Sequence, residues 1–301
     1  MAQDRIEEHD LGLFHDLKVM ERRRALVMMA SAGTVGLLAA CGGDGSSSGG
    51  TTTTSTGSTS TTGSTSTTST TSTTTSSTSG GTGTCVALPT ETNGPYPADG
   101  TNTSSGSTSN VLTSTGVVRS DIRASFLGST TVAGGVRVTL TLTVANVNAS
   151  CAPLSGYAVY LWHCDRNGQY SLYDLPAESY LRGVQVTDAN GQVTFTTIFP
   201  GCYSGRYPHI HFEVFSSLSN ATGGRFARLV SQLAMPSAAC TSVYADTATY
   251  PNSASRFAST TTANDNVFGD NTSAQITAMT PTFNGTPSAG YTMAATIGIA
   301  I

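Results

Sequence analysis

The C-terminal part of the chain contains short runs in which apolar and polar residues alternate. Residues 137–144 (Arg-Val-Thr-Leu-Thr-Leu-Thr-Val) and 192–198 (Gln-Val-Thr-Phe-Thr-Thr-Ile) repeat every second residue, as half-buried strands do. Residues 157–163 are more continuously apolar and predict a buried strand, and residues 291–301 predict a final strand. No segment after Cys85 keeps a helical period. The pattern predicts an all-β fold, an antiparallel β-sandwich with long loops and little helix.

Two Asn-Gly pairs separate these runs. Asn167-Gly168 and Asn190-Gly191 are the kind of sequence that favours a two-residue hairpin turn. We therefore expect Tyr170, which follows the first pair, to lie at the start of the next strand.

The N-terminal part has a different composition. From Gly45 to Thr84 every residue is Ser, Thr or Gly, so this segment has no apolar side chains to bury and is predicted to be disordered. Upstream, three arginines at 22–24 precede a moderately apolar run at 25–40, which is the layout of a signal peptide. A short core helix is the alternative, but the disordered segment follows it at once.

The residues around Cys41 indicate how the chain is exported. Leu38-Ala-Ala-Cys41 is similar to a bacterial lipobox, in which the cysteine is lipidated, and the paired arginines resemble a twin-arginine signal. We expect an exported periplasmic or cell-surface protein that contacts a membrane only through a lipid on Cys41. The predicted organisation is a signal peptide over 1–41, a linker over 42–84 and a folded domain over 85–301.

Composition and charge exclude several function classes. Only 11% of the residues are charged, against a usual quarter, because the Ser/Thr/Gly segment dilutes them. The net charge is −4 and no basic face follows the N-terminus, which argues against binding to nucleic acid. Lys18 is the only lysine, so the predicted domain cannot form a Schiff base with a substrate or with pyridoxal phosphate.

The six cysteines suggest disulfides in an oxidising compartment. With Cys41 lipidated, five remain, and at least one of them must be unpaired. We expect Cys85 to pair with Cys151, and a second pair is expected between Cys202 and Cys240.

Two histidines and two tyrosines form a candidate metal site. His209 and His211 lie two residues apart in a predicted strand that continues through 212–215, so both imidazoles share one face, about 6.6 Å apart at the backbone. That spacing suits two ligands of one ion, although two ordinary core or surface histidines would show the same pattern. Tyr203 precedes them after a Pro-Gly turn, and Tyr170 lies further upstream. A phenol has a pKa near 10, so only a strong Lewis acid such as Fe(III) makes phenolate binding favourable; otherwise both tyrosines are core aromatics.

Several stretches, in the same order along the chain, resemble the intradiol ring-cleavage dioxygenases, the family of catechol and protocatechuate dioxygenases. They are residues 93–96 (Asn-Gly-Pro-Tyr), 162–170, 181–188, 197–203 and 205–211. The most specific element is Pro-Gly-x-Tyr followed by Arg-x-x-His-Ile-His. Residues 10–17 are also similar to the leader of the exported bacterial branch.

The resemblance implies a function and a set of ligands. It implies that the chain cleaves a small aromatic diol with O2 between its two oxygenated carbons, giving a muconate-type diacid. The cofactor would be non-haem Fe(III), held by two tyrosines and two histidines, here Tyr170, Tyr203, His209 and His211. Tyr203 corresponds to the axial tyrosine, which leaves the metal when the catechol binds and can take up a substrate proton.

The resemblance also assigns roles to neighbouring residues. Arg206 corresponds to an arginine that lies over the substrate ring, with a purely structural salt bridge as the alternative. Gln232 corresponds to a glutamine near the iron, and Tyr96 is expected at the mouth of the substrate pocket. His163 has no ligand role left and is expected to be structural.

Departures from the family pattern leave the substrate open. Residues 93–97 read Asn-Gly-Pro-Tyr-Pro in place of the usual Glu-Gly-Pro-Tyr-Tyr, and Cys202 stands where a bulky aromatic often precedes the axial tyrosine. Two alternatives compete with the dioxygenase hypothesis. Glu213 could join His209 and His211 in a 2-His-1-carboxylate iron(II) site. The chain could also be a tethered β-sandwich that binds aromatics or proteins without turnover.

Overall fold

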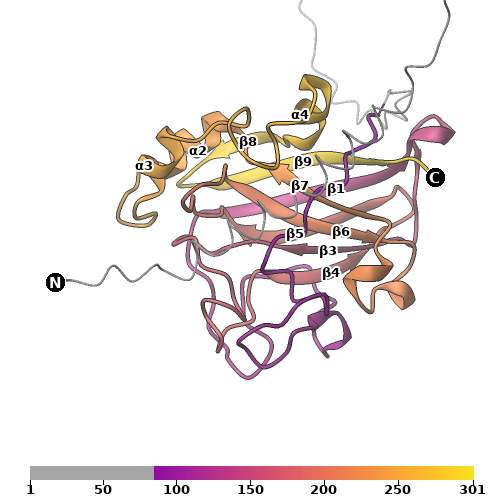
Figure 1. Cartoon of the computed structure of the whole chain (residues 1–301), viewed down its shortest axis with the longest axis horizontal. Helices are drawn as coiled ribbons and strands as arrows, with labels where there is room; N and C mark the ends of the chain where they lie inside the picture. Colours follow the sequence, from indigo (N-terminus) through magenta and orange to yellow (C-terminus); the bar gives the residue numbers. More distant parts are fainter. Residues whose placement is uncertain (1–84) are drawn as a thin grey trace, which may run out of the picture. The chain divides into compact units, whose positions relative to one another are not determined.

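The computed structural model describes residues 85–301, which form two β-sheets with long loops and short helices (Figure 1). The predicted signal peptide over 1–41 and linker over 42–84 lie outside the described residues. The strands are β1 (Arg137–Asn146), β2 (Ala152–Pro153), β3 (Ala158–Trp162), β4 (Arg182–Val186), β5 (Gln192–Ile198), β6 (His209–Phe215), β7 (Leu229–Ala234), β8 (Thr282–Thr286) and β9 (Gly290–Ile299). All five strands expected from the sequence are present, as β1, β3, β5, β6 and β9.

The helices are short. The α-helices are α2 (Ser237–Tyr244), α3 (Ser253–Ala258) and α4 (Ser273–Met279), and the 3-10 helices are η1 (Val111–Thr113), η2 (Val147–Ala149), η3 (Leu218–Asn220) and η4 (Gly224–Phe226). The sequence pattern did not indicate these elements individually. Within residues 85–301 there is no helix with the length and apolar character needed to span a membrane.

The first sheet has the strand order β2-β1-β9-β8, and β5 also pairs with β1. The second sheet has the order β4-β3-β6-β7 and is antiparallel throughout. The predicted β-sandwich is confirmed, with one departure: β1 and β9 run parallel, from Val138 opposite Tyr291 to Asn146 opposite Ile299. No hairpin turn joins β1 to β9, because residues 147–289 separate them, so their pairing is not constrained to the antiparallel direction.

The main hydrophobic core lies between the two sheets. Val138, Leu140 and Leu142 of β1 point into it and are fully buried, whereas the threonines between them are only half-buried. From the second sheet, Ile210, Phe212 and Val214 of β6 enter the same core. Because side chains alternate along a strand, the other residues of β6 must point away from this core.

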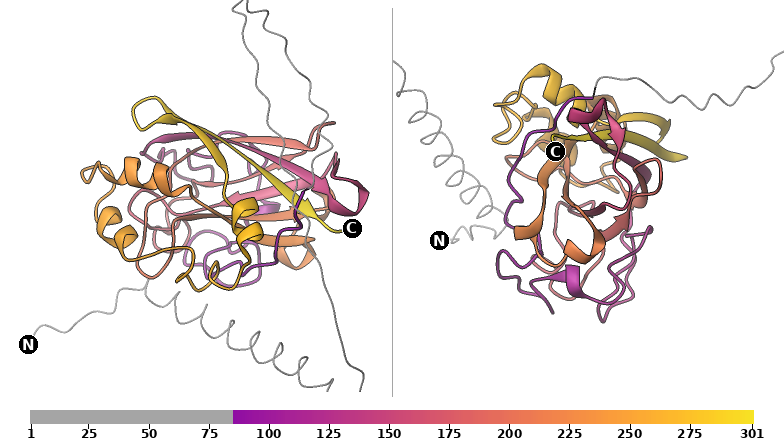
Figure 2. Two further views of the ribbon diagram at one scale, coloured as in Figure 1. Left: turned by 90° about the horizontal axis from the view of Figure 1, so that it is seen from above. Right: turned by 90° about the vertical axis from the view of Figure 1, so that its right-hand side faces the viewer.

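The outer face of the second sheet is buried too. Every residue of β6 is buried, including the polar ones that point away from the main core. A second hydrophobic cluster, which includes Tyr160 and Trp162 of β3, covers this face together with residues from the long loops before β1 and between β3 and β4. These loops lie on the opposite side of the molecule from the yellow C-terminal strand (Figure 2). The fold thus provides a closed, loop-covered face in which polar side chains can be buried.

Both Asn-Gly pairs form turns, but the predicted hairpins are wrong. Gly168 and Gly191 have φ values of +86° and +72°, as such turns require. After the first turn the chain stays irregular until β4, so Tyr170 lies in a loop and not at the start of a strand. The second turn connects β4 in one sheet to β5 in the other. A local turn signal does not determine whether its flanking strands pair.

One of the two expected disulfides is present. Cys85 and Cys151 are bonded and tie the start of the described chain to the segment before β2. The expected pair of Cys202 and Cys240 is wrong, because both residues are buried free thiols, as is Cys164.

Candidate functional site

Two histidines from β6 and two tyrosines from loops bring their polar atoms together on the loop-covered face. His209 Nε2 lies 3.1 Å from His211 Nε2 and 3.1 Å from Tyr203 Oη. Tyr170 Oη lies 3.2 Å from His211 Nε2, 3.5 Å from His209 Nε2 and 3.5 Å from Tyr203 Oη. We call these four side chains the donor quartet. The four residues that the sequence analysis selected as metal ligands therefore meet at one point.

The strand and its neighbour orient the two imidazoles. His211 lies opposite Trp162 of β3, whose ring stacks on the imidazole at a centroid distance of 4.8 Å and an interplanar angle of 6°. His209 Nδ1 lies 2.6 Å from the carbonyl oxygen of Tyr207, which can only accept a hydrogen bond. The Nδ1 atom of His209 therefore carries the proton, and its Nε2 presents a lone pair to the centre of the quartet.

Burial keeps both histidines neutral and the buried phenol protonated when no metal is bound. Removal from water, and then the charge of Arg206, lower the pKa of His209 to about 3. Removal from water, followed by the neighbouring His209, lowers the pKa of His211 well below its ordinary value. Burial raises the pKa of Tyr170 well above 10. The imidazole lone pairs are thus available at neutral pH.

The quartet fits a single metal ion. Donors that each lie about 2.0–2.1 Å from one ion at tetrahedral angles are about 3.3 Å apart, and five of the six pairs of quartet atoms are separated by 3.1–3.5 Å. The Nε2 lone pair of His209 also faces Nε2 of His211 at 3.1 Å, and two ring nitrogens this close need a proton or a cation between them. Neutral imidazoles with phenolates are a donor set suited to a ferric ion.

Glu213 does not complete a site with the histidines. It follows them on the same face of β6 and is fully buried, but its carboxyl group lies against Asp99 and Gly224. Burial and the carboxyl of Asp99 raise the pKa of Glu213 well above its usual value. No group of three or more His, Cys, Asp or Glu side chains within 85–301 is arranged to hold a metal ion. The 2-His-1-carboxylate alternative is therefore not formed.

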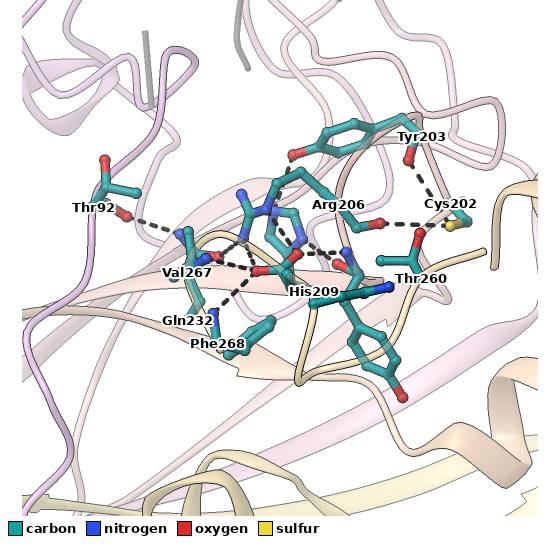
Figure 3. A network of polar contacts seen from close by, with 12 residues as sticks. Thr92, Cys202, Tyr203, Arg206, His209, Gln232, Thr260, Val267 and Phe268 are labelled. Atoms are coloured by element: carbon teal, nitrogen blue, oxygen red, sulfur yellow. Dashed lines mark hydrogen bonds and ion pairs between the residues drawn. The ribbon is translucent and has the colours of Figure 1, made fainter. Parts of the chain in front are cut away.

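Arg206 and Gln232 belong to a buried polar network beside the quartet (Figure 3). Arg206 Nε lies 3.0 Å from Asp265 Oδ2 in a buried ion pair. Arg206 Nη2 donates to Gln232 Oε1 at 2.7 Å, and Gln232 Nε2 donates to the carbonyl of Thr92 at 2.9 Å. Arg206 thus forms the salt bridge that the sequence analysis gave as the alternative. The positive charge of Arg206 also lowers the pKa of His209 and of His211.

Asp265 is the residue of this network that the sequence analysis missed. It lies 59 residues from Arg206, in the polar stretch Ala263-Asn-Asp-Asn266, which resembles a surface turn. The fold nevertheless buries it almost completely. Burial first raises the pKa of Asp265, but the charge of Arg206 and the hydrogen bond from the Tyr207 N–H outweigh this and lower it below the ordinary value. Only the three-dimensional pairing reveals its role.

Tyr96 lies beside the quartet and His163 lies outside it. The position of Tyr96 at the mouth of a substrate pocket stays a prediction. The half-buried ring of Tyr96 packs on Tyr170 of the quartet at a centroid distance of 4.7 Å. His163 is buried outside the quartet, and its ring nitrogens contact the carbonyl of Cys164 at 2.8 Å and the hydroxyl of Thr197 at 2.6 Å. His163 is therefore structural.

A surface pocket of about 300 Å³ lies apart from the quartet. Its lining residues are Asp99, Gly100, Thr101, Asn110, Thr222, Gly223, Gly224 and Arg225. None of these residues belongs to the quartet or to the Arg206 network.

Comparisons with known proteins bear on the fold and on part of the sequence. Residues 124–219 match the family model described as "Dioxygenase". The structure is similar to an intradiol ring-cleavage dioxygenase from Tetranychus urticae, with 23% identity, coverage of 72% of this chain and 95% of that chain, and a TM-score of 0.53. A second dioxygenase crystal structure gives 24% identity, the same coverage and the same TM-score. No curated protein sequence matches the chain.

A more distant likeness is to the dioxygenase domain of a dioxygenase and carbohydrate-binding protein fusion from Streptomyces sp. SirexAA-E. It has 21% identity, covers 72% of this chain and 99% of that chain, and has a TM-score of 0.43. Because the first two structures are only 23% and 24% identical to this chain, their similarity establishes the fold alone. The family model adds a sequence match over residues 124–219. The described part of the chain thus has the fold of the intradiol ring-cleavage dioxygenases, and residues 124–219 within it match a dioxygenase family model.

Proposed function

We propose that the protein is a non-haem Fe(III) intradiol dioxygenase, which cleaves catechol-type rings with O2 to muconate-type diacids. The observation that carries the proposal is the donor quartet: two neutral imidazoles and two phenols converge, with five of their six donor-atom distances at 3.1–3.5 Å, on the loop-covered face of a fold like that of the intradiol dioxygenases. Bound there, Fe(III) would supply the Lewis acidity that makes a catechol reactive towards O2.

The two tyrosines have unequal surroundings, which supports different roles. Tyr170 is fully buried and is held between His211 and Tyr96. Tyr203 is only half-buried, and its phenol contacts His209 at 3.1 Å. We therefore assign to Tyr203 Oη the part of a proton acceptor for the incoming diol, and to Tyr170 that of a fixed ligand.

The buried network supplies charge and excludes water. The guanidinium of Arg206 is held beside the quartet, where a positive charge stabilises the negative charge of a bound catecholate. Gln232 holds that guanidinium from the second sheet. The rings of Trp162 and Tyr96 cover two members of the quartet and keep water from them.

The test uses the full-length chain loaded with Fe(III). We expect a visible absorption band from tyrosinate-to-iron charge transfer, a shift of this band on anaerobic addition of a catechol, and O2 uptake with ring cleavage in air. Tyr203→Phe should lose most of the activity. Tyr157→Phe, a tyrosine outside the quartet, is the matched control and should keep it.

Two outcomes would overturn the proposal in different ways. A colourless protein with full iron occupancy would rule out ligation by the two tyrosines, and unaltered cleavage by the Tyr203→Phe variant would remove the role given to Tyr203. A protein whose spectrum shifts with catechol, but which never consumes it, would favour the binding-module alternative.

We also propose that the protein is exported and anchored through a lipid on Cys41. The support is the arginine-rich and apolar sequence before Cys41 and the Ser/Thr/Gly segment after it. In a bacterial host, the chain should enter the membrane fraction and incorporate labelled lipid, and the Cys41→Ser variant should do neither.

A further inference from the structure

Asp265 connects two parts of the candidate site that are far apart in sequence. Its Oδ2 atom faces Arg206 Nε at 3.0 Å and accepts the backbone N–H of Tyr207 at 2.6 Å. Its Oδ1 atom accepts the backbone N–H groups of Val267 at 2.8 Å and Phe268 at 3.0 Å. Three backbone donors therefore fix the carboxylate, and the fixed carboxylate in turn fixes the arginine.

We propose that Asp265 is a positioning residue of the active site, which holds the Arg206 guanidinium beside the donor quartet and, through Tyr207, orients the His209 ring. The catalytic meaning of this inference rests on the proposed function. The geometric part does not, because it concerns contacts that exist without iron.

The route to His209 passes through one residue. Asp265 accepts from the N–H of Tyr207, and the carbonyl of the same Tyr207 accepts from Nδ1–H of His209 at 2.6 Å. The loop that carries Asp265 also packs beside His209, since the Phe268 ring centroid lies 6.5 Å from that of His209 and 6.2 Å from that of Tyr207. A shift of Asp265 would therefore move both the hydrogen bond and the packing that set the imidazole.

Stability alone gives a weak reason for this ion pair. A buried Arg–Asp pair loses so much hydration that replacing both partners by apolar residues is often neutral or stabilising. Arg206 has a long flexible side chain, and Gln232 fixes only its Nη2 end. Oδ2 of Asp265 accepts from Nε of Arg206, and Oδ1 of Asp265 lies 3.4 Å from Nη2 of Arg206. Two contacts from one carboxylate fix the plane of the guanidinium.

The first test measures this geometry in the iron-free, full-length protein. Hydrogen exchange of the arginine Nε–H groups is followed by 15N NMR, and the Arg206 signal is identified by its absence in the Arg206→Lys variant. We expect a slowly exchanging signal that exchanges at least tenfold faster in Asp265→Asn. Asp121→Asn breaks an exposed Asp–Arg pair with Arg123 and is the matched control, which should leave the signal unchanged.

Unchanged exchange in Asp265→Asn would overturn the inference. So would an equal acceleration of the backbone amides of β1, because the effect would then be a general loss of stability. Retention of slow exchange in Asp265→Glu, which keeps the charge, would support the inference.

The second test uses the iron-loaded protein and a double-mutant cycle. Anaerobic catechol titration of the visible band should give a Kd at least tenfold higher in Asp265→Asn, while the same substitution in the Arg206→Lys background should change Kd less than twofold. Independent effects would show that Asp265 does not act through Arg206 and would overturn the inference. If the wild-type protein bound iron but no catechol, the proposed function would fail, whereas the exchange experiment would still decide the role of Asp265.

Discussion

Replacement of Gly168 by alanine should disturb the site through a single contact. Gly168 has a φ of +86°, and a Cβ atom there would lie 2.9 Å from the Cβ of Tyr203. The left-handed backbone costs a non-glycine residue about 1–2 kcal/mol, and overpacking against the half-buried Tyr203 side chain adds about 1–3 kcal/mol. Gly168→Ala should therefore lower the free energy of unfolding by about 2–5 kcal/mol.

Gly156→Ala is the matched control, because Gly156 has a similar φ of +78° and nothing within 4 Å of the added Cβ. It should show only the backbone cost. The difference of about 1–3 kcal/mol between the variants corresponds to about 2–12 °C in Tm for a domain of this size. Urea and thermal denaturation of both variants would measure it, and iron retention would report on Tyr203. Equal destabilisation by both variants, or normal iron binding by Gly168→Ala, would refute the reasoning.

Three further perturbations test other parts of the fold. Burial lowers the pKa of His163 to about 4, so the unfolded chain takes up a proton that the folded chain does not. The free energy of unfolding should therefore fall as the pH drops from about 6.5 to 4. His163→Gln should show a smaller difference between its urea midpoints at pH 7 and pH 5 than the wild-type protein, and an equal difference in both proteins would contradict the reasoning. Cys151→Ser removes the disulfide with Cys85, which closes a loop of 66 residues. The loss of this constraint on the unfolded chain should lower the free energy of unfolding by about 4 kcal/mol. A reductant should then lower the urea midpoint of the wild-type protein but not that of the variant. Trp162→Phe removes part of the stack on His211 and should cost about 1–3 kcal/mol in denaturation followed by circular dichroism; an unchanged midpoint would show that the stack adds nothing.

The parts of the site that depend on local periodicity could be predicted from the sequence. His209 and His211 share a face because any strand alternates, and the structure places both at the quartet. Periodicity does not connect them to Tyr170 and Tyr203, which lie in irregular segments. Their place beside the histidines was expected only from the resemblance to a family.

Features that depend on distant partners were not predictable in this way. The buried position of Asp265 depends on how a polar loop packs against Arg206. The pairing of Cys202 with Cys240 was wrong because sequence does not report the distance between two thiols. By contrast, α4 carries a readable local signal that was overlooked, since Thr272 and Gln275 form a capping box at its start.

The parallel pairing of β1 with β9 has a consequence for how the protein is made. β9 lies between β1 and β8, so residues 290–299 supply a central strand for a sheet whose other strands begin at residue 137. As the chain leaves the ribosome, β1 can pair with β5, but its other edge stays open until residues 290–299 are synthesised. Long-range pairings of this kind form slowly, and open edges promote wrong association. The first sheet therefore cannot be completed strand by strand, and until residues 290–299 have left the ribosome the unpaired edge of β1 stays open to wrong pairing.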